Sequence, residues 1–287
     1  HKDFFFTNYG RTALYVILKS LHLPPKSKIG VPLYCCTVVF DAIINAGHTP
    51  RFIDINNNYT MDPEDLKSKI EDLSAVVVIH TFGRPADMDA IKKVAGRVPI
   101  IEDCSHSLLS EYKGKITGTI GDMAIFSLAK YLSAGGGGLL IVNNRFFTEK
   151  IQEEINALQE PSVLNEILHT TTAYMRSFFY HKPWFGLFGL PAGLMLEKKV
   201  DLMTKKSSRM TAGYKTYTDI TLKKLCDFRS KVEMQRKNSF FLIDKLKDSS
   251  LVLPLEEKNT YCNYYLFPLR VNNRDKTNEY LRRKGVD

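Results

Sequence analysis

Apolar strands alternate with helical segments along the first half of the chain, and this alternation limits the fold more than any other feature. Short continuous apolar runs, such as residues 75–80 (AVVVIH), are typical of strands buried on both faces. Strands that alternate with helices predict βαβ units, so we expect an α/β protein with a mostly parallel sheet flanked by helices. The predicted strands are 28–32, 51–55, 75–80 and 98–103. Two helices are predicted at 10–21 and 38–46, and two more are predicted to begin near residues 62 and 87.

The second half of the chain has fewer such units. Apolar spacing there predicts helices at 149–168, 221–246 and 277–284 and a strand at 264–271. We therefore expect a large domain of residues 1–200, with an apolar insertion at about 170–196, and a smaller α+β domain of residues 201–287.

Ligands of parallel sheets gather beyond the carboxyl ends of the strands. Those ends carry His80, Asp103, Ser127 and Lys130 in this sequence. A carboxylate at the end of an apolar strand is costly without a partner. Asp103 can therefore cap the next turn, or it can pair with a protonated heteroaromatic nitrogen. The convergence of these residues predicts a binding site at this edge of the sheet.

A lone lysine lies between the buried strand that ends at Ser127 and four glycines at 135–138. Most lysines extend their ammonium group into water. Glycines allow backbone to approach a bound group closely, and a desolvated lysine can lose its proton and become an imine-forming nucleophile. Residues 10–12 (GRT) begin a helix, which offers either an ordinary cap or an anion seat. Together these features describe a pyridoxal phosphate site.

The formal net charge of +9 is compatible with nucleic acid, anionic membranes or anionic substrates as partners. Lys and Arg are scattered, with no run of five, which favours anionic substrates and argues against nucleic acid. The five cysteines include an adjacent pair and show no CxxC or metal spacing. We therefore expect a reducing, cytoplasmic location, with neither a disulfide framework nor a metal.

The chain resembles the DegT/DnrJ/EryC1/StrS family of sugar aminotransferases, which have the fold-type-I pyridoxal-phosphate architecture. The resemblance rests on blocks that follow one another in the family's order. These blocks are residues 10–14 (GRTAL), 31–36 (VPLYCC) with 45–50 (NAGHTP) and 52–55 (FIDI), 80–89 (HTFGRPADMD), 101–106 (IEDCSH), 118–122 (GTIGD) and 126–127 (FS), followed by Lys130 and the glycines.

The resemblance implies three catalytic residues. Lys130 would form the imine link to the aldehyde of pyridoxal 5'-phosphate and later move a proton between substrate and cofactor. Asp103 would hold the pyridinium nitrogen. His106 would lie on the cofactor ring, where the family has Gln or His.

It also implies residues that bind the cofactor. Ser127 and the backbone at Arg11 and Thr12 would hold the phosphate. Cys36 stands where the family commonly has an aromatic residue that stacks on the ring. The family's Gly-Glu-Gly-Gly is Gly-Gly-Gly-Gly at 135–138, so a carboxylate near the active site is missing.

The implied function is transfer of an amino group from an amino acid, expected to be glutamate, to a nucleotide-linked keto sugar by a homodimer, in glycan or amino-sugar biosynthesis. Relatives that act as dehydratases carry histidine in place of the lysine, so Lys130 favours transamination. The alternatives are a dehydratase or lyase of the same fold and a catalytically silent relative that acts as a binding subunit. Because family members continue past the position of Asp287, we expect the small domain to be incomplete.

The sequence allows more than one role for two segments in the second half of the chain. Residues 174–191 are apolar and aromatic but contain Arg, His, Lys, Pro and Gly, which makes them too broken to span a bilayer. We favour a dimer-interface or substrate-flanking insertion over contact with a membrane surface. Residues 205–211 (KKSSRMT) match the family's Asn-Tyr-Arg-Met only at Arg209 and Met210, so a phosphate contact and a solvated basic loop both remain possible.

Overall fold

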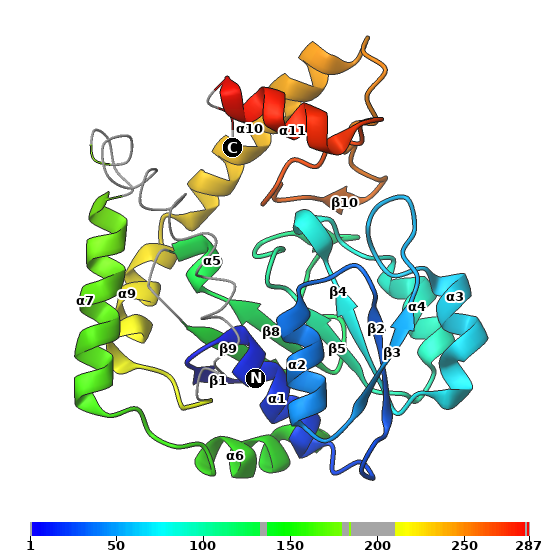
Figure 1. Cartoon of the computed structure of the whole chain (residues 1–287). Coiled ribbons are helices and arrows are strands. Elements are labelled where there is room, and N and C mark those ends of the chain that lie inside the picture. Colours follow the sequence, from blue (N-terminus) through cyan, green and yellow to red (C-terminus); the bar gives the residue numbers. More distant parts are fainter. Residues whose placement is uncertain (1, 133–136, 180–183, 185–209, 285, 287) are drawn as a thin grey trace.

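A computed structural model describes residues 2–132, 137–179, 184, 210–284 and 286. Its centre is a seven-stranded sheet in the order β1-β9-β8-β5-β4-β2-β3 (Figure 1). The strands from β8 to β3 run parallel, and β9 lies antiparallel between β8 and β1. The predicted α/β fold with a mostly parallel sheet is therefore confirmed. The strands are β1 (Asp3–Thr7), β2 (Lys28–Pro32), β3 (Thr49–Ile53), β4 (Ala75–Ile79), β5 (Ile100–Asp103), β8 (Met123–Ser127) and β9 (Gly138–Val142).

Helices cover both faces of this sheet. The helices α1 (Gly10–Ser20) and α2 (Thr37–Asn45) pack on one face, and α3 (Pro63–Lys69) and α4 (Met88–Ala95) pack on the other. Successive residues of a strand point to opposite faces. In β4, Val77 therefore joins the core on the α1 side, whereas Val76 joins the core on the α4 side.

The helix starts follow the capping signals in the sequence. Asp62 accepts a hydrogen bond from the amide of Glu64 and precedes Pro63, the first residue of α3. Asp87 accepts a hydrogen bond from the amide of Ala90 at 3.1 Å and caps α4. Both caps satisfy amides that have no partner inside the helix.

The predicted helix at 149–168 is in fact two helices, α6 (Thr148–Asn156) and α7 (Val163–Phe179). Between them, Gln159 forms an isolated parallel bridge with Thr211, and its carbonyl accepts a hydrogen bond from the amide of Ala212 at 3.2 Å. Pro161 follows, and proline cannot donate the amide that a continuing helix needs. The tertiary bridge and the proline thus outweigh the helical spacing.

The predicted helix at 221–246 is also divided, into α9 (Lys215–Leu225) and α10 (Phe228–Leu246). The predicted strand at 264–271 is wrong. Tyr264 has a φ of 49°, and the amide of Tyr265 donates to Oδ1 of Asn263 at 2.9 Å, so the chain turns there.

A second sheet joins distant parts of the chain in the order β10-β6-β7. Its strand from the C-terminal part pairs with a hairpin from the first half, next to α10 and the last helix (Figure 1). The division into domains at about residue 200 stays a prediction. The other strands and α-helices of the described residues are β6 (Glu111–Tyr112), β7 (Lys115–Ile116), α5 (Ala129–Leu132), β10 (Thr260–Tyr261) and α11 (Arg274–Arg283).

Most of the apolar insertion and residues 205–209 lie outside the described residues. Within the part of the chain that the structure describes, no helix has both the length and the apolar character needed to cross a bilayer.

Candidate active site

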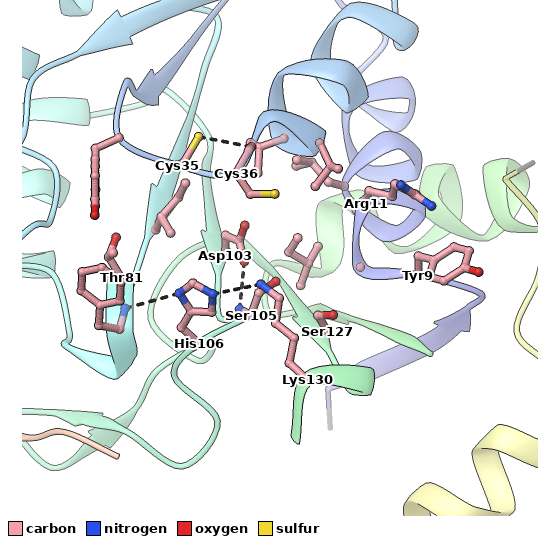
Figure 2. Close-up of a pocket in the computed structure, with 18 residues that line it drawn as sticks. Tyr9, Arg11, Cys35, Cys36, Thr81, Asp103, Ser105, His106, Ser127 and Lys130 are labelled. Atoms are coloured by element: carbon pink, nitrogen blue, oxygen red, sulfur yellow. Dashed lines mark hydrogen bonds between the residues drawn. The ribbon is translucent and has the colours of Figure 1, made fainter. Parts of the chain in front are cut away.

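A cavity of about 490 Å³ opens beyond the carboxyl ends of β5 and β8, the edge where the sequence places a site (Figure 2). Its apolar wall includes Leu14 of α1 and Val39 of α2. The polar and charged side chains of the lining include Tyr9, Arg11, Thr81, Asp103, Ser105, His106, Ser127 and Lys130.

Strand register explains why these side chains converge. Ile79 of β4 pairs with Asp103 of β5, which pairs in turn with Ile125 of β8. All three line the cavity, because paired residues of neighbouring strands point to the same face. Ser127, two residues beyond Ile125, shares that face.

Lys130 lies on α5 and directs its amine toward His106 (Figure 2). The distance from Nζ of Lys130 to Nε2 of His106 is 3.0 Å. Burial, together with the positive charge of Lys130, lowers the pKa of His106 from 6.5 to about 4, although Asp103 acts in the opposite direction. The imidazole is therefore neutral near pH 7 and binds the lysine without adding a second positive charge.

Asp103 is buried, and its Oδ1 accepts a hydrogen bond from the amide of Ser105 at 2.9 Å. The turn-capping role considered for this residue is thus present. Among the described residues, the carboxylate makes no other hydrogen bond, and it faces the cavity. One oxygen therefore orders the turn, and the other remains available to a bound group.

The N-terminus of α1 reaches the cavity at Tyr9, Gly10 and Arg11, beside Ser127. The capping residue Tyr9 provides no side-chain hydrogen bond, and the first turn of α1 carries no acidic residue. Helix amides and the helix dipole favour an anion at such an end. This end of the cavity suits a phosphate group.

Thr12 lies differently from the other predicted residues. Its amide donates to the carbonyl of Tyr9 at 3.0 Å, and its hydroxyl donates to Oδ1 of Asn8 at 2.6 Å. Thr12 is fully buried and does not line the cavity. It orders the start of α1, and the predicted phosphate contact of its backbone stays a prediction.

The described glycines of the loop lie close to the backbone that precedes α1. The amide of Gly137 donates to the carbonyl of Asn8 at 2.8 Å, and its φ is 107°. A Cβ atom on Gly138 would lie 2.3 Å from the carbonyl oxygen of Tyr9. These contacts hold the start of α1 against the start of β9. Residues 135 and 136 lie outside the described residues.

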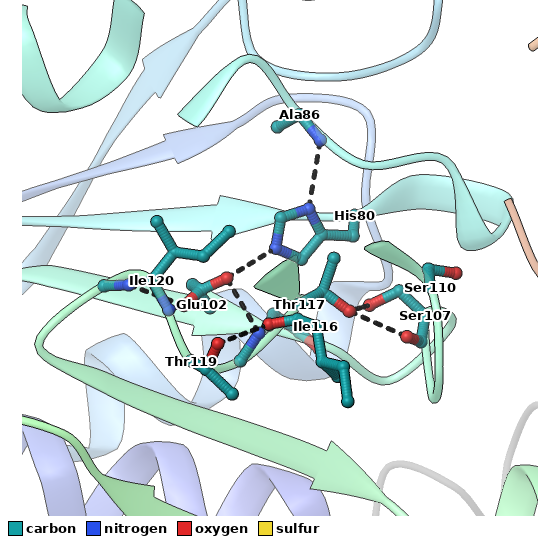
Figure 3. A network of polar contacts seen from close by, with 12 residues as sticks. His80, Ala86, Glu102, Ser107, Ser110, Ile116, Thr117, Thr119 and Ile120 are labelled. Carbon is teal, nitrogen blue, oxygen red and sulfur yellow. Dashed lines mark hydrogen bonds and ion pairs between the residues drawn. The ribbon is translucent and has the colours of Figure 1, made fainter. Parts of the chain in front are cut away.

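His80 lies on the opposite face of the sheet, which corrects its expected place in the site (Figure 3). Its Nε2 is 3.0 Å from Oε2 of Glu102, and its Nδ1 accepts a hydrogen bond from the amide of Ala86. Because Nδ1 accepts, the ring proton is on Nε2 and is donated to Glu102. Cys104 is close enough to His80 and Glu102 to share a metal ion with them. Both ring nitrogens of His80 already form hydrogen bonds, so neither is free to bind a metal.

Glu102 is fully buried and completes this network. Burial opposes its ionisation, but the hydrogen bond and attraction from His80 and the amides of Gly121 and Gly118 outweigh that effect and lower the pKa of Glu102. The group is a satisfied structural network rather than part of the site.

The structure brings six of the seven predicted site residues to the cavity: Arg11, Cys36, Asp103, His106, Ser127 and Lys130. Aromatic residues that the sequence analysis did not single out are also present. Tyr34 and Phe82 line the cavity, and their ring centroids are 6.1 Å apart. Both lie inside blocks of the family resemblance, which was the available signal. Tyr265, which stacks on His106, had no such signal because the contact is distant in sequence.

Comparison with known proteins places the chain in one family. The DegT/DnrJ/EryC1/StrS aminotransferase family matches residues 4–287. GDP-perosamine synthase of Escherichia coli O157:H7 is 33% identical over 142 residues, which are 47% of this chain and 39% of that protein. The spore coat polysaccharide biosynthesis protein SpsC of Bacillus subtilis (strain 168) is 29% identical over 214 residues, which are 71% of this chain and 54% of that protein.

The chain thus spans about half, or less, of the length of these curated relatives. The crystal structure of S. venezuelae DesV has the same fold, with a TM-score of 0.74 at 19% identity, covering 99% of this chain and 68% of DesV. The resemblance predicted from the sequence blocks is confirmed: the chain belongs to the DegT/DnrJ/EryC1/StrS aminotransferase family.

Proposed function

We propose that this protein is a pyridoxal-phosphate-dependent aminotransferase that transfers an amino group to a keto sugar carried on a nucleotide. The observation that carries the proposal is the placement of the Lys130 amine and the Asp103 carboxylate on one cavity whose far end is the N-terminus of α1. An amine, a carboxylate and an anion seat are the three groups that this cofactor requires of a protein.

The unmet polar groups of the lining support the fit. The buried hydroxyl of Thr81 has no hydrogen-bond partner among the described residues. Asp103 has spare acceptor capacity, and a buried carboxylate favours a positive charge beside it. A bound group with a protonated ring nitrogen and a phosphate would complement both ends of the cavity.

Each residue then has a separate task. When bound, the cofactor supplies an electron sink for the carbon that exchanges its amino group. Asp103 keeps the ring nitrogen protonated. Lys130 provides the amine that holds the cofactor and moves a proton at the substrate carbon. Ser127 and the amides at the start of α1 fix the phosphate, and neutral His106 orients Lys130.

The nucleotide-sugar substrate is supported by the relatives. One is named a GDP-perosamine synthase and another acts in spore coat polysaccharide biosynthesis. The net charge of +9 suits anionic substrates. Glutamate as donor, a homodimer and a cytoplasmic location belong to the proposal. The five free thiols are the basis for that location.

Lys130 lies on the cavity, and its amine is within hydrogen-bonding distance of His106. Because relatives that act as dehydratases carry histidine at this position, the lysine favours transamination over the dehydratase alternative. Cys36 lines the cavity in place of an aromatic ring, which keeps a silent binding subunit as the second candidate.

The test is an amine-transfer assay with pyridoxal phosphate, glutamate and a panel of nucleotide keto sugars. We expect an aminated sugar and 2-oxoglutarate in equal amounts. The variant Lys130→Ala should give neither product, whereas Lys113→Ala should behave as wild type, because Lys113 is exposed and pairs with Asp89 away from the cavity. Cofactor binding without product from any sugar would support the silent relative. Loss of water from the sugar without amine transfer would support the dehydratase.

A further inference from the structure

An aromatic residue from the C-terminal part of the chain packs behind the Lys130–His106 pair. The ring of Tyr265 stacks on the imidazole of His106, with centroids 4.8 Å apart and an interplanar angle of 16°. Its ring also lies 5.0 Å from that of Tyr131, the residue after Lys130. Tyr265 itself does not line the cavity. It therefore covers a part of His106 that is turned away from the cavity.

Tyr265 is held in this position by a buried asparagine. The amide of Tyr265 donates to Oδ1 of Asn263 at 2.9 Å. Asn263 is fully buried, and its Nδ2 donates to the carbonyl of Leu108 at 2.9 Å. The amide of Asn263 donates to Oγ of Ser110 at 3.1 Å. The segment that follows His106 is thus bonded directly to the segment that carries Tyr265.

The side chain of Asn263 also packs directly against Gly83, where a residue with a Cβ atom would not fit. A Cβ atom on Gly83 would lie 1.9 Å from Oδ1 of Asn263. Ser110 also donates its hydroxyl to the carbonyl of Gly83 at 2.7 Å. The turn next to Phe82, the loop after His106 and the C-terminal segment therefore meet in one close contact, which fixes Tyr265 relative to the cavity.

We propose that Tyr265 is a positioning residue for the reaction: its flat ring fixes the plane of the His106 imidazole and thereby holds Nε2 of His106 against Nζ of Lys130. This inference rests on the proposed function for its catalytic consequence. Its physical part, the control of His106 by the ring of Tyr265, stands on the contacts alone.

The ring, rather than the hydroxyl, carries this role. No hydrogen bond of the Tyr265 hydroxyl occurs among the described residues. Burial is the largest cause of the lowered pKa of His106, and an aromatic ring stacked on the imidazole is part of that burial. Removing the ring opens one face of the imidazole to water, and its plane then depends on the long hydrogen bond from the amide of Phe82 to Nδ1 (3.4 Å) and on the contact with Lys130. The titratable groups that face His106 are Lys130 of α5, Asp103 of β5 and Tyr265.

The test compares Tyr265→Phe, which keeps the ring, with Tyr265→Ala, which removes it. Tyr280→Ala is the matched control, because Tyr280 is an exposed tyrosine on α11. In the cofactor-free protein, histidine NMR signals are titrated with acid, and the His106 signal is assigned by its loss in His106→Gln. We expect the midpoint of about 4 in wild type, Tyr265→Phe and Tyr280→Ala. In Tyr265→Ala it should rise by about one pH unit or more toward 6.5.

In the amine-transfer assay, Tyr265→Ala should lower kcat by about 10- to 100-fold, as expected when a catalytic group is misplaced, with a smaller effect on KM. Tyr265→Phe should stay within about twofold of wild type. If Tyr265→Ala does not fold, Tyr265→Leu, which fills most of the volume without a flat ring, takes its place with the same expectation.

Two results would overturn the inference. One is an unchanged His106 titration and kcat after loss of the ring, and the other is an equal defect in Tyr265→Phe. Failure of the proposed function is distinguishable, because wild type would then transfer no amine while the His106 titration still responded to Tyr265.

Discussion

Two carboxylates that are neighbours in β5 have opposite surroundings. Glu102 is fully buried, and it accepts hydrogen bonds from His80 and from the amides of Gly118, Ile120 and Gly121 (Figure 3). Asp103 accepts one hydrogen bond, from Ser105, and otherwise faces the cavity (Figure 2). The alternation of the strand separates them, because adjacent residues point to opposite faces of the sheet.

The difference separates stability from chemistry. A buried carboxylate with all its hydrogen bonds made stabilises the fold and has no capacity left for a ligand. A carboxylate with spare acceptor capacity on a cavity is costly for the fold and is the group that a cationic ligand would satisfy. We therefore expect substitutions at the two positions to affect different measurements.

Asp103→Asn should have the largest effect, and it should be on activity. Asparagine keeps the shape and can still accept from the amide of Ser105, but it cannot hold a positive charge at a ring nitrogen. We expect kcat to fall by about 10²- to 10³-fold, with little change in the melting temperature. Amine-transfer kinetics and thermal unfolding measure the two quantities. Normal turnover combined with a large loss of stability would reverse the roles assigned to the two carboxylates.

Glu102→Gln should have the complementary effect, on stability. In the wild type, both oxygens of Glu102 accept hydrogen bonds from buried donors. A glutamine replaces one of these oxygens by an NH2 group, which cannot accept, so at least one buried donor loses its partner. We expect the free energy of unfolding to fall by about 3 kcal/mol, measured by urea denaturation. The control is Glu64→Gln, an exposed residue of α3. An unchanged denaturation midpoint would show that the network of Glu102 does not stabilise the fold.

The pH dependence of stability should report on His106. Its pKa is about 4 in the folded protein and 6.5 when unperturbed, so between these values the unfolded chain binds a proton that the folded protein does not. The free energy of unfolding therefore falls as pH drops from 6.5 to about 4, by at most about 3 kcal/mol from this group. Urea denaturation of His106→Gln across this range should show a shallower fall than wild type.

Exposed His22 provides the control for that series, since His22→Gln should keep the wild-type slope. Parallel curves for wild type and His106→Gln would mean that the imidazole beside Lys130 is not buried in solution.

Ser127→Ala should have the smallest effect. The serine lines the end of the cavity beside the start of α1, where helix amides provide most of the anion seat. Loss of one hydroxyl should weaken cofactor binding by about tenfold, equivalent to about 1.4 kcal/mol. Titration of the cofactor-free protein with pyridoxal phosphate measures this. An unchanged dissociation constant would place the phosphate elsewhere.

The sequence predicted the parallel strands and the edge where the site lies, because continuous apolar runs and their ends are local features. It did not separate His80 from Asp103, since one residue of offset along a strand moves a side chain to the other face. The difference between these residues depends on strand pairing, which brings His80 to Glu102 on the far side of the sheet.

The wrong strand prediction in the second half of the chain has a different cause. Residues 264–271 have the apolar, aromatic character of a strand, but the left-handed backbone of Tyr264 and the turn at Asn263 direct Tyr265 onto His106. Tertiary contacts outweigh local propensity there. The sequence analysis did not identify Tyr265 as part of the site, because its partner His106 lies far away in the first half of the chain.

Covalent attachment of the cofactor to Lys130 can be tested directly. The protein is loaded with pyridoxal phosphate, reduced with borohydride, digested, and examined by peptide mass spectrometry. We predict a pyridoxyl group on Lys130 in wild type and none on that peptide in Lys130→Ala. A pyridoxyl group on a different lysine, or bound cofactor that borohydride attaches to no lysine, would contradict the account.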